Sequence, residues 1–337
     1  MDCVIVTGGA GYIGSHACKA LRRAGFLPVC YDNLCHGHER AVRWGPLVVG
    51  DISDAAELQR TIARHKPVAV MHFAAFTSVG ESVSDPKKYY RNNVAGALTL
   101  FEAARAGGVK AVIFSSTAAV YGNPQAVPIP ETAELKPINP YGRSKLMMEN
   151  MLADFHAAYG LASASLRYFN AAGADPDGET GEDHNPETHL IPRTLMAASG
   201  ELSGLAVFGT DYDTPDGTAI RDYIHVTDLA EAHVLAMKHI LEKGGARQFN
   251  LGTGAGFSVR EIIAAVERTT GLRVPLRLAP RRQGDPPRLV ADPTRAREEL
   301  GFVTRHSDIE SIVSSAWLWH SMNMTRPSSQ DGAQAVG

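Results

Sequence analysis

The sequence predicts an α/β protein with a doubly wound parallel sheet and a smaller α/β domain that is partly interleaved with that sheet. Two observations predict this class. Short apolar runs alternate with helical patterns over residues 1–170, which is the element order of a parallel sheet with crossover helices. Several runs end in small or polar residues, and the carboxyl ends of parallel strands are where such sheets bind ligands.

Size and charge describe an ordinary globular protein of about two domains. The chain has 337 residues, of which 44% are hydrophobic and 20% charged, and its formal net charge is −3. Lysine and arginine are dispersed along the chain. We therefore expect neither a nucleic-acid surface nor attraction to an anionic membrane.

The sequence offers no sign of secretion or of a membrane span. Its four cysteines form no C-x-x-C pair, and an acidic residue and a strand-like run follow Met1 directly. The uncharged run at 111–130 contains three prolines, which a membrane helix would not tolerate well. We expect reduced thiols, no signal peptide and a cytoplasmic location.

The first expected strand, Cys3 to Val6, leads into a glycine-rich turn and then a helical pattern that runs to Gly25. The turn carries Gly8, Gly11 and Gly14. This spacing lets the main chain approach a pyrophosphate closely and places the phosphates at the helix N-terminus. Because the motif follows a strand and opens a helix, it predicts a dinucleotide site in a Rossmann sheet.

The second expected strand, Pro28 to Tyr31, ends at Asp32 and Asn33. Asp32 lies close to the offset of about 20 residues at which an acidic side chain binds the adenosine ribose. A carboxylate there accepts hydrogen bonds from the ribose hydroxyls and repels a 2′-phosphate. The sequence therefore favours NAD over NADP.

Three further strands are expected at Leu47–Val49, Val68–Met71 and Ala111–Phe114, with helices at about 54–65 and 86–107 between them. The last of these strands is the most apolar. It leads into a run of hydroxyl-bearing residues, Ser115 to Thr117, which places hydroxyls at the carboxyl end of a central strand.

A helix is expected from Pro140 to Gly160, because proline suits the first turn of a helix. Tyr141 and Lys145 are four residues apart and would share one face of this helix. A nearby cation favours the phenolate form of tyrosine, so the pair is a candidate for proton abstraction. Chance alone can supply this spacing, so its meaning depends on the residues around it.

The composition of the chain changes after the strand that ends at Asn170. Residues 171–185 are rich in Gly, Asp and Glu and are expected to form a long surface loop, followed by short helices and strands. We predict a nucleotide-binding Rossmann domain at 1–170, a substrate-binding domain at 171–325 and a disordered tail at 326–337. Helices are expected at about 189–199, 226–241, 258–270 and 306–320, and strands at 206–209 and 248–251.

The chain resembles the extended short-chain dehydrogenase/reductases, and most closely their epimerase branch. The likeness extends from residue 2 to about 320. The segments that carry it are TGGAGYIGSH, GDI, VGESV, SSTAAVYG, YGRSK, LRYFNAAGA, RDYIHVTDLA, NLGTG and APRRQGD.

This resemblance implies reversible epimerisation at C4 of UDP-glucose and UDP-galactose through a 4-keto sugar, with a tightly held NAD⁺ that accepts and returns a hydride. It also implies a homodimer. Tyr141 would be the base, and Lys145 would lower the pKa of Tyr141 and bind the nicotinamide ribose. Thr117, where the family usually has serine, would bridge the sugar 4-oxygen and Tyr141.

The resemblance also implies binding residues. Cofactor contacts are implied for Gly8, Gly11, Tyr12, Ile13, Gly14, Asp32, Asn33, Asp51, Ile52, Phe73, Ala74, Asn92 or Asn93, Ser115, Tyr141, Lys145 and Tyr168. Arg221 and Arg282 would clamp the UDP diphosphate, for which a guanidinium fork is suited. Substrate contacts are implied for Thr117, Tyr141, Asn170, His189, Phe208, Arg221, Tyr223, Arg282, Asp285 and Leu289.

Three positions depart from the family pattern. Thr77 stands where bacterial relatives often have an NAD-contacting lysine, and His189 stands where members commonly have asparagine. Leu289 stands where some members have a tyrosine that narrows the hexose pocket, so UDP-N-acetylhexosamines are an alternative substrate class.

Other activities of the same fold fit the sequence less well. Related 4,6-dehydratases need an Asp-Glu pair after the threonine, and decarboxylases keep a glutamate at the second of those positions. Here these positions are Ala118 and Ala119, which cannot transfer protons. A non-catalytic NAD sensor is a further alternative, which the intact Thr117, Tyr141 and Lys145 set disfavours.

We expect no metal site. His184 and His189 are close in sequence, but Pro186 interrupts the loop between them, so a solvated loop is favoured over a ligand pair.

Overall fold

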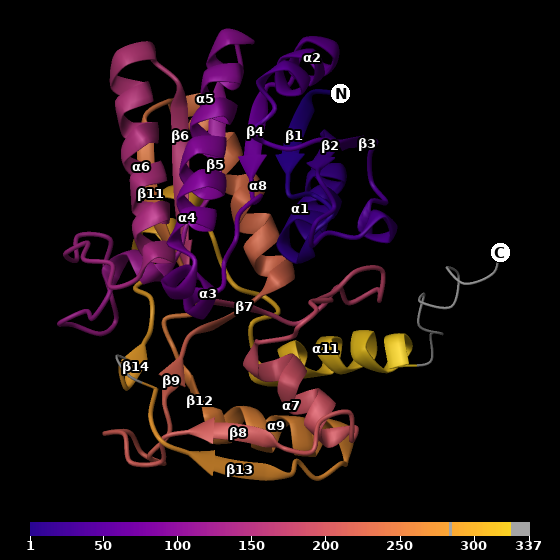
Figure 1. The fold of residues 1–337 in the computed structure, drawn as a ribbon, viewed down its shortest axis with the longest axis vertical. Helices are drawn as coiled ribbons and strands as arrows, with labels where there is room; N and C mark the ends of the chain where they lie inside the picture. The colour runs from indigo at the N-terminus through magenta and orange to yellow at the C-terminus, as the bar shows by residue number, and fades with distance from the viewer. Residues whose placement is uncertain (283–284, 325–337) are drawn as a thin grey trace.

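Seven parallel strands form the main sheet of the computed structural model, which describes residues 1–282 and 285–324 (Figure 1). Their order across the sheet is β11-β6-β5-β4-β1-β2-β3. This is a doubly wound order, because the chain proceeds outward from β1 in both directions. The strands are β1 (Cys3–Thr7), β2 (Leu27–Asp32), β3 (Leu47–Val49), β4 (Ala69–His72), β5 (Ala111–Ser115), β6 (Ala162–Tyr168) and β11 (Ala246–Leu251).

Helices cover both faces of this sheet because both faces are apolar. On β1, Val4 and Val6 belong to one buried core and Ile5 belongs to another, as the two-residue period of a strand requires. The core with Val4 also contains side chains of α1 (Tyr12–Arg23) and α8 (Val226–Lys243). The core with Ile5 contains side chains of α2 (Ala55–His65), α5 (Ala97–Ala106) and α6 (Pro140–Tyr159).

The sheet is completed by a distant part of the chain. β11 pairs in parallel with β6, with Phe249 opposite Leu166. Helix α8, which precedes β11, packs on the face that α1 also covers. Residues 226–251 therefore belong spatially to the sheet, although they follow much of the smaller lobe in the sequence.

The smaller lobe lies below the sheet in Figure 1 and has a core of its own. Ile191, Val207, Ile262 and Ile312 are buried together in it. Short strand pairs border this core: β7 (Asn170–Ala172) with β10 (Tyr223–His225), β8 (Leu205–Phe208) with β13 (Leu276–Ala279), and β9 (Ile220–Arg221) with β12 (Phe257–Ser258) and β14 (Arg288–Leu289). Its helices are α7 (Leu190–Ala198), α9 (Val259–Thr270) and α11 (Ile309–Met324).

Most expected elements are present, with different bounds in places. The helix expected at about 86–107 is divided into α4 (Pro86–Tyr89), the π-helix η2 (Tyr90–Gly96) and α5. The helix expected at 306–320 begins at Ile309 and extends to Met324. The remaining short helices are η1 (Glu39–Ala41), α3 (Val79–Ser84), η3 (Ala118–Tyr121) and α10 (Thr294–Leu300).

Two further expectations concern the tail and membranes. The tail predicted at 326–337 lies outside the described residues. Among the helices of residues 1–282 and 285–324, none has both the length and the apolar character that a membrane crossing needs.

Candidate active site

The glycine turn after β1 has the shape that a bound dinucleotide requires. Gly8 has φ +74°, and a Cβ built on it would lie 2.7 Å from the main-chain nitrogen of Ala74. A Cβ on Gly14 would lie 2.1 Å from the carbonyl oxygen of Gly8. No side chain caps α1 at Gly11, as far as the described residues show, so the first N–H groups of the helix can bind phosphate. The turn therefore fits a pyrophosphate.

Asp32 holds this turn against the end of β2. Its carboxylate accepts hydrogen bonds from the main-chain N–H groups of Ala10, at 3.0 Å, and Leu34, at 2.8 Å. Each carboxylate oxygen keeps further acceptor capacity, because an ionised carboxylate offers about four lone-pair sites. Asp32 can thus both shape the turn and accept hydrogen bonds from ribose hydroxyls.

The other predicted cofactor residues lie at the carboxyl ends of neighbouring strands. Asp51 follows β3 and accepts a hydrogen bond of 2.7 Å from Asn33, which places both beside Asp32. Phe73 and Ala74 follow β4, and their N–H groups donate to the carbonyl oxygen of Thr7 on β1. These contacts put the residues at the carboxyl-terminal end of the sheet, where an α/β fold binds its ligand.

Three cofactor candidates are mainly buried in the protein interior or bonded within it. Ile52 is buried in the core beneath α2 and α5. Asn93 is buried in η2, where its amide oxygen accepts a hydrogen bond from the N–H of Phe76 and its amide nitrogen donates to the carbonyl oxygen of Phe76. Asn92 is partly exposed and donates to the amide oxygen of Asn93. Asn92 is therefore the freer of the two amides, and its role stays a prediction.

Lys145 lies at the carboxyl end of β5. Its Nζ donates a hydrogen bond of 2.8 Å to the carbonyl oxygen of Ser115, and the ammonium lies 5.0 Å from the Phe114 ring centroid. Burial lowers its pKa to about 7, and the carboxylate of Glu149 partly opposes this change. The hydroxyl groups of Ser115 and Tyr168 bond each other beside it. Lys145, Ser115 and Tyr168 thus form one polar group at the carboxyl ends of the neighbouring strands β5 and β6.

Tyr141 and Lys145 lie close together on α6, with the ammonium 5.9 Å from the phenol ring centroid. The lowering of the Tyr141 pKa by Lys145 stays a prediction: without a cofactor, burial raises this pKa and a hydrogen bond with Thr117 partly lowers it. The physical reason is that the phenol is desolvated, while the ammonium bonds Ser115 instead.

Thr117 stands at the start of η3, where its hydroxyl caps the short helix by accepting a hydrogen bond from the N–H of Ala119. Ala118 is buried and Ala119 is partly exposed, and neither side chain carries a proton donor or acceptor. Thr117 and Tyr141 are therefore the hydroxyls available for proton transfer at this position.

A buried network behind Lys145 was not predicted. Glu149 follows Lys145 by one helical turn, and it forms an ion pair of 2.5 Å with Arg167 on β6. Ser116 donates to the same carboxylate at 2.5 Å, and Arg167 also donates to the Tyr121 hydroxyl at 3.0 Å. The i, i+4 spacing after a candidate lysine was the available signal.

Several predicted substrate residues contact one another in the smaller lobe. Arg221 on β9 forms an ion pair with Asp285, and the Arg282 guanidinium lies 4.1 Å from the Phe208 ring centroid. Both guanidinium groups thus lie next to other predicted substrate residues.

The remaining substrate candidates flank this group. Asn170 lies opposite Tyr223 in the β7–β10 pair and donates to the carbonyl oxygen of Asp222 at 3.1 Å. Leu289 lies opposite Arg221 in the β14–β9 pair and packs in the small core of Ala118. Leu289 therefore adjoins the segment that carries Thr117, whereas substrate contacts of any of these residues stay predictions.

His189 is placed differently from the other substrate candidates. It precedes α7 at the N-cap, is about half exposed, and its Nδ1 lies 2.5 Å from a carboxylate oxygen of Glu182. His184 lies 3.1 Å from the same oxygen, so the loop brings together two histidines that were expected to be solvated.

Comparisons with known proteins agree over almost the whole chain. The model of the NAD dependent epimerase/dehydratase family matches residues 4–252. A UDP-glucose 4-epimerase from Rhizobium leguminosarum bv. trifolii is 52% identical over 319 residues, which cover 95% of this chain and 97% of that protein.

Two solved structures are similar in fold as well as in sequence. The crystal structure of UDP-glucose 4-epimerase from Brucella ovis in complex with NAD has a TM-score of 0.93 and 58% identity, and covers 94% of this chain and 98% of that chain. The enzyme from Bifidobacterium longum, in complex with NAD⁺ and UDP, has a TM-score of 0.90 and 40% identity, with coverage of 96% and 99%.

Proposed function

We propose a function from one premise: the chain belongs to the NAD dependent epimerase/dehydratase family. It is an NAD-dependent isomerase that interconverts UDP-glucose and UDP-galactose at C4 through a 4-keto sugar. The observation that carries this conclusion is the set of Tyr141, Thr117 and Lys145 at the carboxyl end of β5, in a protein whose glycine turn fits a dinucleotide. Relatives over nearly the full length that are named as this enzyme support it.

In this mechanism Tyr141 is the base. Its phenolate removes the proton of the sugar 4-hydroxyl. The Thr117 hydroxyl forms hydrogen bonds to both the sugar 4-oxygen and the phenol and so holds them together. When bound, NAD⁺ would supply the acceptor for the hydride that leaves C4 of the sugar, and its positive nicotinamide would lower the pKa of Tyr141. The ammonium of Lys145 would bind the ribose of the nicotinamide half of the cofactor.

The arrangement also explains why epimerisation is favoured over elimination. Ala118 and Ala119 supply no acid or base for elimination across C5 and C6 of the sugar. The 4-keto sugar is therefore reduced again at C4. Arg221 and Arg282 bind the diphosphate and hold the nucleotide while the hexose turns over. We propose that 1–170, together with α8 and β11, binds NAD, and that the rest of 171–325 binds the UDP-sugar.

We further propose a cytoplasmic homodimer. All four cysteines are free, which suits a reducing compartment. Leu98 on α5 and Met147 on α6 expose apolar side chains on two helices that pack side by side, and this face suits a second copy of the chain. Size-exclusion chromatography with light scattering should give twice the chain mass of 36.1 kDa.

A UDP-N-acetylhexosamine is the alternative substrate class. Leu289 supports it, because leucine leaves more room than tyrosine beside Ala118 in the small core that adjoins Thr117. A non-catalytic NAD sensor is disfavoured, since a binding module needs no phenol with a hydroxyl partner.

The decisive experiment incubates purified protein with UDP-galactose, without added NAD, and follows the formation of UDP-glucose. Conversion by the wild type and its loss by at least about a hundredfold in Tyr141→Phe support the proposal, since a positioned base contributes about 10²–10⁴-fold. Absence of conversion by the wild type, even with added NAD, would contradict it, and retained NAD without turnover would favour the sensor.

A further inference from the structure

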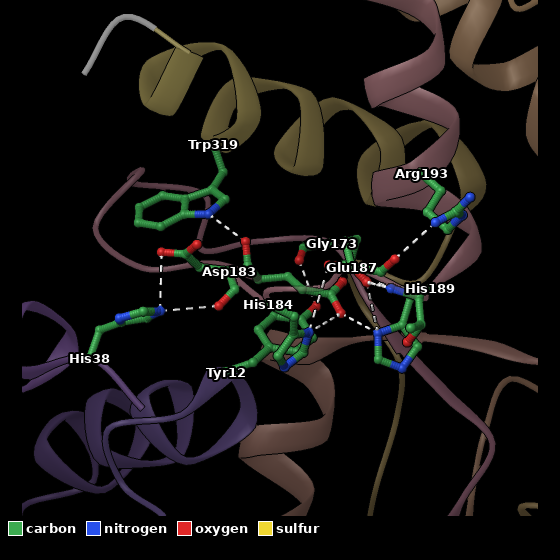
Figure 2. Close-up of polar contacts among 11 residues, drawn as sticks. Tyr12, His38, Gly173, Asp183, His184, Glu187, His189, Arg193 and Trp319 are labelled. Carbon is green, nitrogen blue, oxygen red and sulfur yellow. Dashed lines mark hydrogen bonds and ion pairs between the residues drawn. The ribbon is translucent and has the colours of Figure 1, made fainter. Parts of the chain in front are cut away.

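The loop between β7 and α7 brings four side chains together that the epimerase chemistry does not use as a group. Glu182, His184, Glu187 and His189 each offer one ligand atom, and these atoms all lie within 4.8 Å of one another. In Figure 2 dashed lines join the imidazole rings of His184 and His189 to carboxylate oxygens beside Tyr12.

The separations between imidazole nitrogens and carboxylate oxygens lie near the spacing of ligands around a tetrahedral ion, with the two contacts to Glu187 made by its two different oxygens. Two ligands at about 2.0–2.1 Å from zinc in a tetrahedron are about 3.3 Å apart. His184 Nδ1 lies 3.1 Å from Glu182 Oε1 and 3.6 Å from Glu187 Oε2, and His189 Nδ1 lies 3.4 Å from Glu187 Oε1. The fourth pair, His189 with Glu182, is at 2.5 Å and would open by less than about 1 Å.

The two carboxylates are buried, and imidazole groups are their only basic partners among the described residues. The side chains of Glu182 and Glu187 are 7% and 8% exposed, and within the described chain their ion pairs are formed only with His184 and His189. Arg193 lies nearby, but it donates to the main-chain oxygen of Glu187 rather than to its carboxylate. Buried charges need compensation, which two protonated imidazoles supply in this structure and which a divalent ion bound by neutral imidazoles would supply equally.

A neighbouring acidic cluster shows what compensation by the chain itself looks like. Asp175, Asp177 and Glu179 surround the Nζ of Lys19 at 2.6–2.7 Å, so an ammonium already occupies their centre. No lysine or arginine of the described residues pairs with the carboxylates of Glu182 and Glu187. The two clusters thus differ in their basic partner: an ammonium cannot ligate a metal ion, whereas the two imidazoles of the second cluster can.

We propose that Glu182, His184, Glu187 and His189 bind one divalent transition metal ion, of which Zn²⁺ best matches two imidazole nitrogens and two carboxylate oxygens. Metal binding leaves the net charge of the cluster unchanged. One dication with two neutral imidazoles balances the two carboxylates, as two protonated imidazoles do without the metal. His189 also bonds Glu187 through its main-chain N–H at 2.7 Å, which helps to orient that carboxylate.

An ion at this position links both lobes. The main-chain oxygen of Glu182 accepts a hydrogen bond from Trp319 on α11, and His189 adjoins α7. The His184 ring lies 6.3 Å from the Tyr12 ring, and Tyr12 donates to the Gly173 carbonyl oxygen at 2.6 Å. The ion therefore ties the smaller lobe to the start of α1, next to the glycine turn.

The test uses full-length protein without a histidine tag, freed of metal by chelation and dialysis. Zn²⁺ titration by calorimetry should give one site per chain, and Co²⁺ should give the intense visible absorption of a tetrahedral ion. X-ray absorption of the Zn²⁺-loaded wild type should show nitrogen and oxygen ligands with imidazole scattering at about 2.0–2.1 Å. Sulfur in the ligand shell would assign the metal to exposed Cys35 and overturn the proposal, as would binding below one ion per chain.

Matched variants locate the site. His184→Gln with Glu187→Gln should weaken Zn²⁺ binding by more than about a hundredfold, since even loss of a supporting hydrogen bond costs 10–100-fold. The control, His239→Gln with Glu102→Gln, removes the same residue types from α8 and α5 and should bind Zn²⁺ like the wild type. Equal affinity of the two double variants would overturn the proposal. If the first variant fails to fold, the X-ray absorption of the wild type still decides.

Discussion

Glu149 and Arg167 form an ion pair of 2.5 Å in which each side chain is only 3% exposed. The pair joins α6, which carries Tyr141 and Lys145, to β6, which lies between β11 and β5 in the sheet. The Glu149 carboxylate also accepts a hydrogen bond from the hydroxyl of Ser116, the residue before Thr117. One buried charge pair thus connects the helix and the loop that together carry the three candidate catalytic residues.

Breaking this pair from one side should destabilise the chain strongly. Glu149→Gln leaves the Arg167 guanidinium buried without a counter-charge, which costs about 3–5 kcal/mol in the free energy of unfolding. The matched control is Glu134→Gln, which breaks an exposed pair with Lys136 and should cost less than about 1 kcal/mol. Urea unfolding followed by circular dichroism measures both, and equal losses would show that burial of the pair is unimportant.

Acid should destabilise the chain through its buried histidines. Burial lowers the pKa of His233 to about 4, and the same direction holds for His16, His72 and His225. Between about pH 6.5 and pH 4 the unfolded chain binds protons that the native chain does not, so stability falls as the pH falls. For His233 alone the loss from pH 7 to pH 5 is about 2 kcal/mol.

His233→Leu tests this assignment, because it removes an imidazole whose Nε2 has no hydrogen-bond partner among the described residues. The variant should lose less unfolding free energy than the wild type between pH 7 and pH 5. His239→Leu, on the same helix but only partly buried, is the control. If both variants respond to acid alike, the assignment to His233 fails.

Removing the Thr117 hydroxyl should shift the pH dependence of turnover. That hydroxyl lowers the pKa of Tyr141, so Thr117→Ala raises it and leaves less phenolate at a given pH. We expect kcat at pH 7 to fall by about tenfold or more, and the rise of kcat with pH to move to higher pH. Thr117→Ser keeps the hydroxyl and should follow the wild-type profile. An unshifted profile in the alanine variant would remove Thr117 from the mechanism.

Leu289→Tyr should narrow substrate selection. If leucine leaves room beside the hexose, the wild type turns over both UDP-galactose and UDP-N-acetylgalactosamine, and the tyrosine variant loses mainly the second activity. The measurement is kcat/KM for both substrates in both proteins. Equal UDP-galactose turnover with no N-acetylgalactosamine activity in either protein would reject the wider pocket.

The nucleotide-binding half was predictable because its signals are local. Each central strand is buried on both faces and is therefore a continuous apolar run, and the glycine turn needs residues without Cβ atoms at fixed positions. The division of the helix after Pro86 was missed, since a π-helix differs from an α-helix in hydrogen-bond register, which side-chain periodicity does not report.

Electrostatic properties were less predictable because they depend on tertiary burial. The spacing of Tyr141 and Lys145 placed them on one helix face, but desolvation decides the direction in which the pKa of Tyr141 shifts. Similarly, the loop that carries Glu182 and Glu187 has the composition of a solvated segment. The structure nevertheless buries both carboxylates beside α7, α11 and Tyr12.

The position of β11 has a consequence for how the protein is made. A ribosome synthesises the chain from the N-terminus, so the first six strands of the sheet emerge before the strand that covers the open side of β6. Until residue 251 has left the ribosome, β6 is an unpaired edge with exposed main-chain groups, which invites pairing with other chains. Truncations within 171–251 should therefore aggregate during translation, and the two lobes cannot be expressed as separate fragments by cutting the chain once.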